Sequence, residues 1–465
     1  MTPTPQPSQA PALDPASEVI LALEQEGFPQ TDYGAFSFTG PCDRAALDQA
    51  FQQAQAAWPR MHAHLGPVRA GFGEALAWRV SQEMNSLQVR DCSTADHVPD
   101  DLEAWVHQHM AGEVDHCLDL AREFPAKLML FLLPGDRGCI VLLFHHVVMD
   151  AGGFYTFMRD VFRLYHRLVT GAEPDWGGAA GMHAQAGGAR PVEAISTRQF
   201  LAAMAAEFRK YPRSRMAQIE SRPQGQTGRT IVRHIIGDPG LQQALRERAR
   251  REDGTVTDLV MAASKLALDE FNTSRGAPPD ILYHCLGVNQ RLRQASSEVA
   301  GQGNPVSLIG IPSDREDRKD PQGLLRHVVS CRTRKLAMGR DVAAGRVAHA
   351  VLRAGRVLPL NARYGLLRAL LEMRISFYLA NLGVVWPRIE DGRPTGETAV
   401  RRVGAMELVD IHSSVGTSRK NANALLLRTF LGRFYLVSLI GRHQVADRDA
   451  EEFSSLVVKK LMAYL

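Results

Sequence analysis

The amino-acid sequence predicts an α+β protein built from two lobes. Its 465 residues, 45% of them hydrophobic, are enough to form two hydrophobic cores of about 200 residues each. Short apolar runs typical of strands are mixed with segments of helical periodicity, without the regular alternation of a doubly wound sheet. We find no internal repeat with the period of a solenoid. These observations favour mixed sheets covered by helices.

Changes in composition indicate where the lobes begin and end. Residues 1–16 are rich in Pro, Ala, Ser and Gln and contain too little apolar surface to pack, so we predict a disordered tail. Residues 171–191 are glycine-rich and lack apolar periodicity, which is typical of a flexible crossing. We therefore predict an N-terminal lobe over residues 17–170 and a C-terminal lobe over residues 192–465.

The predicted N-terminal lobe has a hairpin between two helices. Asp43 can cap the first helix. Residues 128–133 and 140–144 are apolar runs joined by a Pro-Gly-Asp-Arg-Gly turn, which predicts two buried strands. From Phe154 the apolar period becomes helical, and Gly171 is a suitable C-terminal cap. For the C-terminal lobe we predict a helix over 256–271, a strand over 281–287, helices within 324–374, a hairpin of 424–430 with 434–440, and a closing helix over 447–464.

The sequence argues against several classes of protein. It has no run of about 18 apolar residues and no signal-peptide pattern, so we expect a cytoplasmic protein without a transmembrane segment. Its six cysteines form no Cys-x-x-Cys pair, which argues against structural zinc and against a disulfide framework. No basic run is interleaved with aromatic residues, so nucleic acid is not an expected partner.

Charge is distributed unequally between the two halves. Residues 1–190 contain 12 Lys and Arg against 23 Asp and Glu, whereas residues 191–465 contain 42 against 27. This asymmetry could help the halves associate, or could attract an anionic ligand or an acidic carrier protein. Arginines that merely solvate helix faces would give the same count.

The chemistry-bearing segment follows the second predicted strand, where residues 145–150 read His-His-Val-Val-Met-Asp. We predict that His146 is a general base, which takes a proton from an alcohol or amine as that group attacks a thioester and later returns it to the departing thiol. The backbone N–H groups of Gly152 and Gly153, at the start of the following helix, could stabilise the oxyanion.

Asp150 is expected to lock the loop rather than to act as a second base, because an aspartate among apolar strands needs a cationic partner. Metal binding by His145, His146 and Asp150 is the alternative. The chain offers no further His-rich cluster to complete such a site, so we predict no metal.

Residues 145–152 resemble the His-His-x-x-x-Asp-Gly signature of the condensation-domain superfamily, whose fold is that of chloramphenicol acetyltransferase. The resemblance covers nearly the whole chain after the tail. Other segments are similar to family motifs in the same order: residues 47–65, the helix 154–171, the helix 255–271, the strand-end segment 287–291, Gly303-Asn304, and Asn381-Leu382-Gly383.

The resemblance implies two lobes in a V, with a channel that admits the acyl thioester from one side and the acceptor from the other. It makes His146 the catalytic histidine, with His145 as its neighbour, and pairs Asp150 with Arg291 in a structural ion pair. It places Asn304 and Asn381 beside the channel. Coenzyme A or phosphopantetheine thioester would be a co-substrate rather than a permanently bound cofactor, and an acyl- or peptidyl-carrier protein is a candidate partner.

The chain departs from the peptide-forming members of that superfamily. Ala151 replaces the signature glycine, Ala380 stands where many relatives have serine, and both the aromatic Asp-Phe segments and the late Gln-Asp-Tyr-Pro segment are missing. These departures favour a free-standing O- or N-acyltransferase of natural-product or lipid biosynthesis. A trans-acting, amide-forming condensation domain of a nonribosomal peptide pathway and a catalytically idle docking module remain open alternatives.

Overall fold

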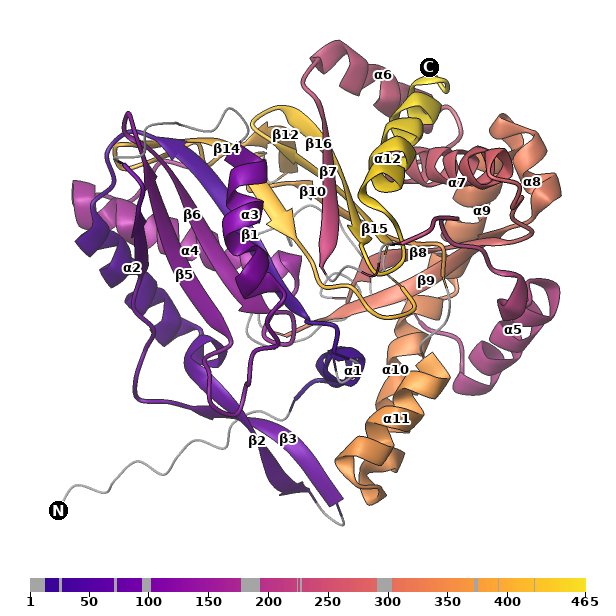
Figure 1. Ribbon diagram of the computed structural model, residues 1–465, viewed down its shortest axis with the longest axis horizontal. Helices are drawn as coiled ribbons and strands as arrows, with labels where there is room; N and C mark the ends of the chain where they lie inside the picture. The colour runs from indigo at the N-terminus through magenta and orange to yellow at the C-terminus, as the bar shows by residue number, and fades with distance from the viewer. Residues whose placement is uncertain are drawn as a thin grey trace.

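Two six-stranded mixed sheets organise the chain in the computed structural model (Figure 1). The structure describes residues 13–24, 27–70, 73–93, 102–176, 193–223, 225, 228–290, 303–371, 375–391, 393–421 and 423–465. The predicted α+β class with two lobes is confirmed. Residues 1–12 of the predicted tail and 177–191 of the predicted crossing lie outside the described residues. Helix α1 (Pro15–Glu24) begins two residues before the predicted start of order.

The first sheet has the strand order β13-β14-β1-β6-β5-β4, antiparallel except for the β4–β5 pair. Apolar residues of α2 and α4 pack into one buried cluster and those of α3 into another, on the opposite face of the sheet. The elements of this lobe are β1 (Thr31–Thr39), β4 (Gln88–Asp91), β5 (Ala126–Leu133), β6 (Arg137–His145), β13 (Arg402–Val403), β14 (Met406–Ser414), α2 (Arg44–Ala57), α3 (Leu102–Val114) and α4 (Ala151–Thr170).

The second sheet has the order β7-β16-β15-β10-β8-β9, in which β10 runs parallel to both of its neighbours. Its strands are β7 (Arg229–Ile236), β8 (Leu282–Asn289), β9 (Val306–Ser313), β10 (Phe377–Val384), β15 (Asn423–Phe430) and β16 (Arg433–Gly441). Its helices are α5 (Thr197–Lys210), α6 (Pro239–Arg250), α7 (Val256–Ser274), α8 (Arg315–Lys319), α9 (Pro321–Ala337), α10 (Arg340–Ala354), α11 (Leu360–Leu371) and α12 (Asp447–Met462). Two small hairpins complete the fold: β2 (Ala63–Ala70) with β3 (Gly73–Val80), and β11 (Pro387–Glu390) with β12 (Arg393–Thr398).

The local signals in the sequence place these elements correctly. The Asp43 carboxylate accepts hydrogen bonds from the N–H groups of Ala45 and Ala46, as expected of an N-cap. Gly171 ends α4 in the left-handed conformation with φ 73°. The predicted hairpin of the N-terminal lobe forms β5 and β6, and the late hairpin forms β15 and β16.

The predicted division of the chain at one crossing is incomplete. Strand β14, from the late part of the sequence, pairs with β1 and so belongs to the first sheet. Trp386 is also buried in the first core, where its ring centroid lies 4.8 Å from that of Phe36 and its indole N–H donates to the carbonyl of Tyr155 at 2.7 Å. Nothing in the local sequence indicates that a late strand joins the first sheet, because the alternation of apolar and polar residues in β14 would suit a strand of either sheet.

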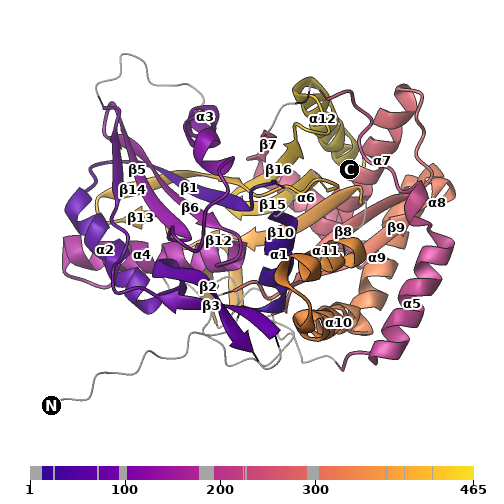
Figure 2. The same ribbon diagram turned by 60° about the horizontal axis from the view of Figure 1, so that its bottom comes forward.

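Helix α1 lies at the junction of the lobes, beside α11 (Figure 2). Buried Ala22 of α1 packs with Leu352, Tyr364 and Leu367 of α10 and α11. The arginine-rich stretch forms α9 to α11. Two of its arginines form ion pairs with neighbouring carboxylates, Arg332 with Asp258 at 2.6 Å and Arg340 with Glu207 at 2.9 Å. Within the described residues, no helix is long and apolar enough to cross a membrane.

Candidate active site

His146 is held at the end of β6 by the neighbouring strand β1. The two strands pair antiparallel, with Thr31 opposite His145, and the His146 N–H donates to the carbonyl of Gln30 at 2.8 Å. The pairing fixes the backbone on both sides of the histidine. It also brings Asp32, the next residue of β1, to the same end of the sheet.

The imidazole of His146 is paired with the carboxylate of Asp32. Nδ1 of His146 lies 2.7 Å from Oδ2 of Asp32, whose side chain is only 2% exposed. Nδ1 itself is buried, yet 32% of the His146 side chain remains exposed. The exposed part is therefore the opposite edge of the ring, which carries Nε2. The histidine presents one nitrogen to the protein and the other to solvent.

The carboxylates around His146 favour its charged form. Burial acts to lower its pKa, but the charge of Asp32, the hydrogen bond to that carboxylate and the charge of Asp150 outweigh it, so that the pKa is raised above its usual value. Asp32 is itself held in place, since its Oδ1 accepts the N–H of Gly416 at 2.6 Å. Sequence reasoning missed Asp32, because only the pairing of β1 with β6 reveals it.

The first histidine of the pair is enclosed. His145 is fully buried, its Nε2 lies 2.9 Å from Oε2 of Glu24, and its Nδ1 accepts the N–H of Val147 at 3.1 Å. Both ring nitrogens are therefore engaged, which leaves no lone pair for a substrate proton. The contact with Glu24 attaches the loop to the end of α1, another partner that the sequence did not reveal.

Asp150 caps the helix that follows the motif. Its Oδ1 accepts the N–H of Gly153 at 2.8 Å, at the first turn of α4. The N–H of Gly153 is already bound by this carboxylate, which conflicts with its predicted role as a donor to the oxyanion. The Asp150 side chain does not bind the N–H of Gly152. The predicted partner of Asp150, Arg291, lies outside the described residues.

Phe154 fixes where this helix begins relative to β1. Gly34 lies under the Phe154 ring, and a Cβ at that position would come within 2.1 Å of the ring. Only glycine lets the aromatic side chain approach the strand this closely. The same ring stacks on Phe144 of β6 at a centroid distance of 5.7 Å, which ties α4 to both strands.

The two predicted asparagines hold backbone and side chains in place. Asn304 Nδ2 donates to the carbonyl of His146 at 2.7 Å and to Ser17 Oγ at 3.0 Å, and its side chain is buried. Next to it, Gly303 donates its N–H to Val148 at 3.1 Å. Asn304 thus reaches from the second lobe to the loop that carries His146. Asn381 is exposed and donates to Thr257 Oγ1 at 2.7 Å.

Among the described residues, no group of three or more His, Cys, Asp or Glu side chains could hold a metal ion. The His146–Asp32 pair has the geometry of a group that can accept and return a proton. A histidine oriented by a buried carboxylate, with its other nitrogen accessible, is the arrangement that general-base catalysis requires.

Comparison with known proteins shows the fold. No family model matches the chain, and no curated protein matches it. Among solved structures, the first condensation domain of the CDA synthetase is similar with a TM-score of 0.69 at 15% identity, covering 98% of this chain and 97% of that one. The trichothecene 15-O-acetyltransferase of Fusarium sporotrichioides is similar with a TM-score of 0.67 at 14% identity, covering 99% and 100%.

A mutant of the starter condensation domain of rhizomide synthetase, in complex with C8-CoA, is similar with a TM-score of 0.63 at 13% identity, covering 98% of this chain and 95% of that one. The chain therefore has the two-lobed fold of condensation domains, as the resemblance of its motifs implied.

Proposed function

We propose that the protein is an acyltransferase that moves an acyl group from a thioester to an alcohol or amine, with His146 as the general base. The observation that carries the proposal is the 2.7 Å contact of His146 Nδ1 with the buried carboxylate of Asp32, which leaves the Nε2 edge exposed. The fold agrees with it, since the structural neighbours include an O-acetyltransferase and a condensation domain in complex with C8-CoA.

The mechanism follows from the orientation of the ring. The negative carboxylate of Asp32, 2.7 Å from Nδ1, favours the tautomer that carries its proton on Nδ1, so the lone pair of Nε2 faces the acceptor. His146 removes the proton from the acceptor O–H or N–H as that atom forms a bond to the thioester carbonyl carbon. The tetrahedral intermediate then collapses, the carbon–sulfur bond breaks, and His146 returns the proton to the departing sulfur. The N–H of Gly152 is the candidate donor to the oxyanion.

The negative carboxylate of Asp32 contributes most when His146 is charged. His146 carries the extra proton in the tetrahedral intermediate, when charge has also developed on the oxygen. A buried carboxylate at 2.7 Å stabilises that imidazolium more than it stabilises the neutral ring. We accordingly assign Asp32 as a positioning residue that acts through His146.

Coenzyme A or phosphopantetheine thioester is the proposed co-substrate, and no permanently bound cofactor is required by this chemistry. An amide-forming condensation between two carrier-bound groups would use the same histidine, and the condensation-domain neighbours keep that reaction as the second candidate. The product separates the two functions: an ester or amide of a free small molecule, or an amide that remains attached to a carrier protein.

The test is an acyl-transfer assay with purified protein. A panel of acyl thioesters is incubated with alcohols and amines, and products are identified by mass spectrometry. His146→Ala should lower kcat/KM by about 10²-fold or more, whereas His116→Ala, an exposed histidine outside the site, should leave it unchanged. Equal activity of the His146 variant and the wild type would contradict the proposal. A folded protein that acylates no acceptor would support the idle alternative.

A further inference from the structure

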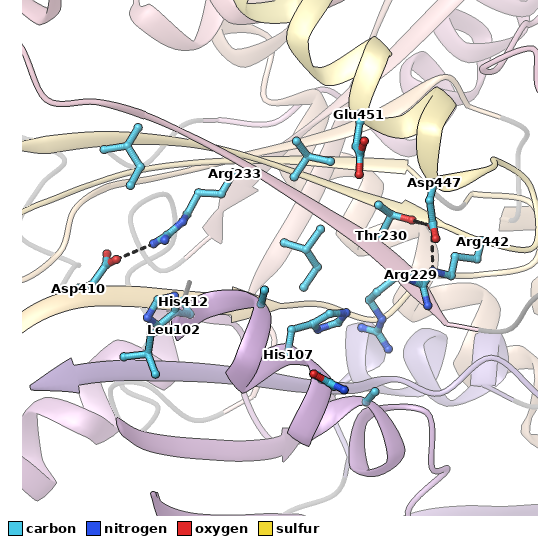
Figure 3. A pocket seen from close by; sticks show the side chains of 16 residues that line it. Leu102, His107, Arg229, Thr230, Arg233, Asp410, His412, Arg442, Asp447 and Glu451 are labelled. Carbon is cyan, nitrogen blue, oxygen red and sulfur yellow. Dashed lines mark hydrogen bonds and ion pairs between the residues drawn. The ribbon is translucent and has the colours of Figure 1, made fainter. Parts of the chain in front are cut away.

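A cleft lies between the lobes on the side of α3. It has a volume of about 890 Å³ and is lined by α3 and β14 of the first lobe and by β7, the start of α12 and Arg442 of the second (Figure 3). A volume of this size fits a small-molecule ligand. Its wall is partly apolar, with Leu102, Ile231 and Ile235, and partly charged. The charged groups decide which ligand the cleft suits.

Two of the three arginines in the cleft are already neutralised. Arg233 forms an ion pair with Asp410 at 2.8 Å, and Arg442 forms one with Asp447 at 2.9 Å. Both pairs are drawn as dashed lines in Figure 3. Because a paired guanidinium has little attraction left for a further anion, these two residues contribute little to ligand charge recognition.

The third arginine, Arg229, has no such partner. Only 4% of it is exposed, its Nη atoms donate to the carbonyls of Val415 and Val114, and its Nε has no hydrogen-bond partner. It forms no ion pair with a carboxylate of the described residues. Desolvation lowers its pKa, against the more distant charges of Asp32 and Asp115. A buried guanidinium with carbonyl partners alone is poorly compensated, and a ligand carboxylate would compensate it.

We infer that this cleft binds a substrate that carries a single carboxylate, and that Arg229 recognises that group. The inference rests on the proposed acyl transfer and names the class of acceptor as a hydroxy or amino acid. A single carboxylate matches the one arginine of the cleft that has no carboxylate partner, and Glu451 on the cleft wall disfavours a ligand with more negative charge. The several phosphate charges of coenzyme A would need several cations, which Arg233 and Arg442 cannot supply while Asp410 and Asp447 hold them.

The cleft is connected to the catalytic pair through hydrogen bonds that two side chains form with the backbone of Val415 and Gly416. Arg229 donates to the carbonyl of Val415, and the next residue, Gly416, donates its N–H to Asp32. Asp32 in turn holds His146. Arg229 is therefore linked to the residue that orients the base through one short chain segment.

The first experiment needs no variant. Isothermal titration calorimetry compares binding of 3-hydroxybutyrate and 4-hydroxybenzoate with binding of their methyl esters to the wild-type protein. The acids should bind at least tenfold more tightly, because a charge-assisted hydrogen bond is worth about 1.5–3 kcal/mol. Equal binding of acid and ester, or no binding of either, would overturn the inference. Since binding is measured without turnover, this result is independent of whether acyl transfer occurs.

The second experiment assigns the carboxylate to Arg229. Arg229→Lys keeps the charge but loses the two-pronged geometry, so KM for the acid acceptor should rise about tenfold while KM for its methyl ester stays constant. Arg428→Lys is the matched control, because Arg428 is also a fully buried arginine that reaches across the lobes, to Ser413 and the carbonyl of Ile411, but does not line the cleft. A similar rise in KM in both variants would show that Arg229 has a structural role and does not bind the carboxylate.

The donor is tested in the same assay. Acyl-coenzyme A and the matching acyl-N-acetylcysteamine thioester differ in their phosphates. If Arg229→Lys weakened the use of acyl-coenzyme A alone, the donor phosphate would be the anion and the inference would be wrong. A third variant, Ala111→Phe, fills the cleft from α3 and should abolish binding of the acid in calorimetry. Unchanged binding in this variant would place the carboxylate elsewhere.

Discussion

Replacing Asp32 with asparagine is the sharpest test of the proposed mechanism. The change keeps the shape of the side chain and an oxygen for the Gly416 N–H, but removes the charge from the buried partner of His146. It also allows the introduced amide to donate a hydrogen bond to Nδ1. The ring would then carry its proton on Nε2, where the proposed base needs a lone pair.

The expected loss of activity follows from the geometry. Two unit charges at 2.7 Å attract each other by about 6 kcal/mol for an effective dielectric constant of about 20. Burial of the ring opposes this attraction, but the net effect still raises the pKa of His146. Losing the orientation of a catalytic histidine reduces kcat by up to about 10⁴ in a Ser-His-Asp triad. Because this ring is partly exposed, we expect kcat/KM of Asp32→Asn to fall by about 10²- to 10³-fold.

The assay is the pH profile of kcat/KM for acyl transfer. A general base must be neutral in the free enzyme, so wild-type activity should be lost as pH falls through the raised pKa of His146. In Asp32→Asn the carboxylate no longer stabilises the imidazolium. The acid limb should therefore move to lower pH, while the plateau above it is lowered. A purely structural role of Asp32 would lower the plateau without moving the limb.

The control is Glu24→Gln, which alters the partner of His145 at a similar distance of 2.9 Å. The introduced amide oxygen can still accept the proton on Nε2, so this variant should keep the limb in place and lose less activity. Thermal unfolding of both variants shows whether either has lost its fold. An Asp32→Asn protein that is folded and as active as the wild type, with the same pH profile, would refute the reasoning.

Changes at Asn304 and Asp150 test the surroundings of the site, and a change at Lys265 tests a buried charge in the second lobe. Asn304→Ala removes the donor to the carbonyl of His146 and should lower kcat with little change in KM. Thermal unfolding should show that the free energy of unfolding falls by about 1–3 kcal/mol. An unchanged kcat would show that Asn304 does not position His146. Asp150→Ala removes the N-cap of α4 and should lower the free energy of unfolding by about 1 kcal/mol, whereas Asp150→Asn can keep the cap and isolates the loss of charge; equal loss of stability in both would point to an ion pair instead. Burial lowers the pKa of Lys265 to about 7, so above that pH the unfolded chain holds a proton that the folded chain lacks. The free energy of unfolding of the wild type should therefore rise by up to about 1.4 kcal/mol per pH unit towards pH 10, as measured by denaturant titrations. Lys265→Met should flatten this rise, and an unchanged slope would assign it to other groups.

The parts of the site that lie close together in the sequence could be predicted from it. The order of strand, histidine pair, aspartate and helix is local, and the structure places β6, residues 145–150 and α4 as expected. His146 is partly exposed and His145 is enclosed, and their roles as base and neighbour stay predictions. These relations depend on short-range periodicity and capping, which a sequence records directly.

The partners that come from elsewhere in the chain could not be predicted. Asp32 reaches His146 only because β1 pairs with β6, and Glu24 reaches His145 only because α1 packs at the junction of the lobes. Asn304 stays a predicted channel residue, and its hydrogen bond to the carbonyl of His146 carries no signal in the sequence. An isolated aspartate or glutamate near the end of a strand or helix is common, so the sequence alone does not mark Asp32 or Glu24 as a partner of a histidine.

These long-range contacts make the position of His146 depend on both lobes. From the second lobe, Asn304 holds the carbonyl of His146 and Gly303 pairs with the loop. From the other side, Arg229 donates to the segment whose next residue fixes Asp32. A rotation of one lobe against the other would therefore disturb the base and its carboxylate together. Because the proposed acceptor binds between the same two lobes, occupancy of the cleft and alignment of the catalytic pair are expected to be coupled.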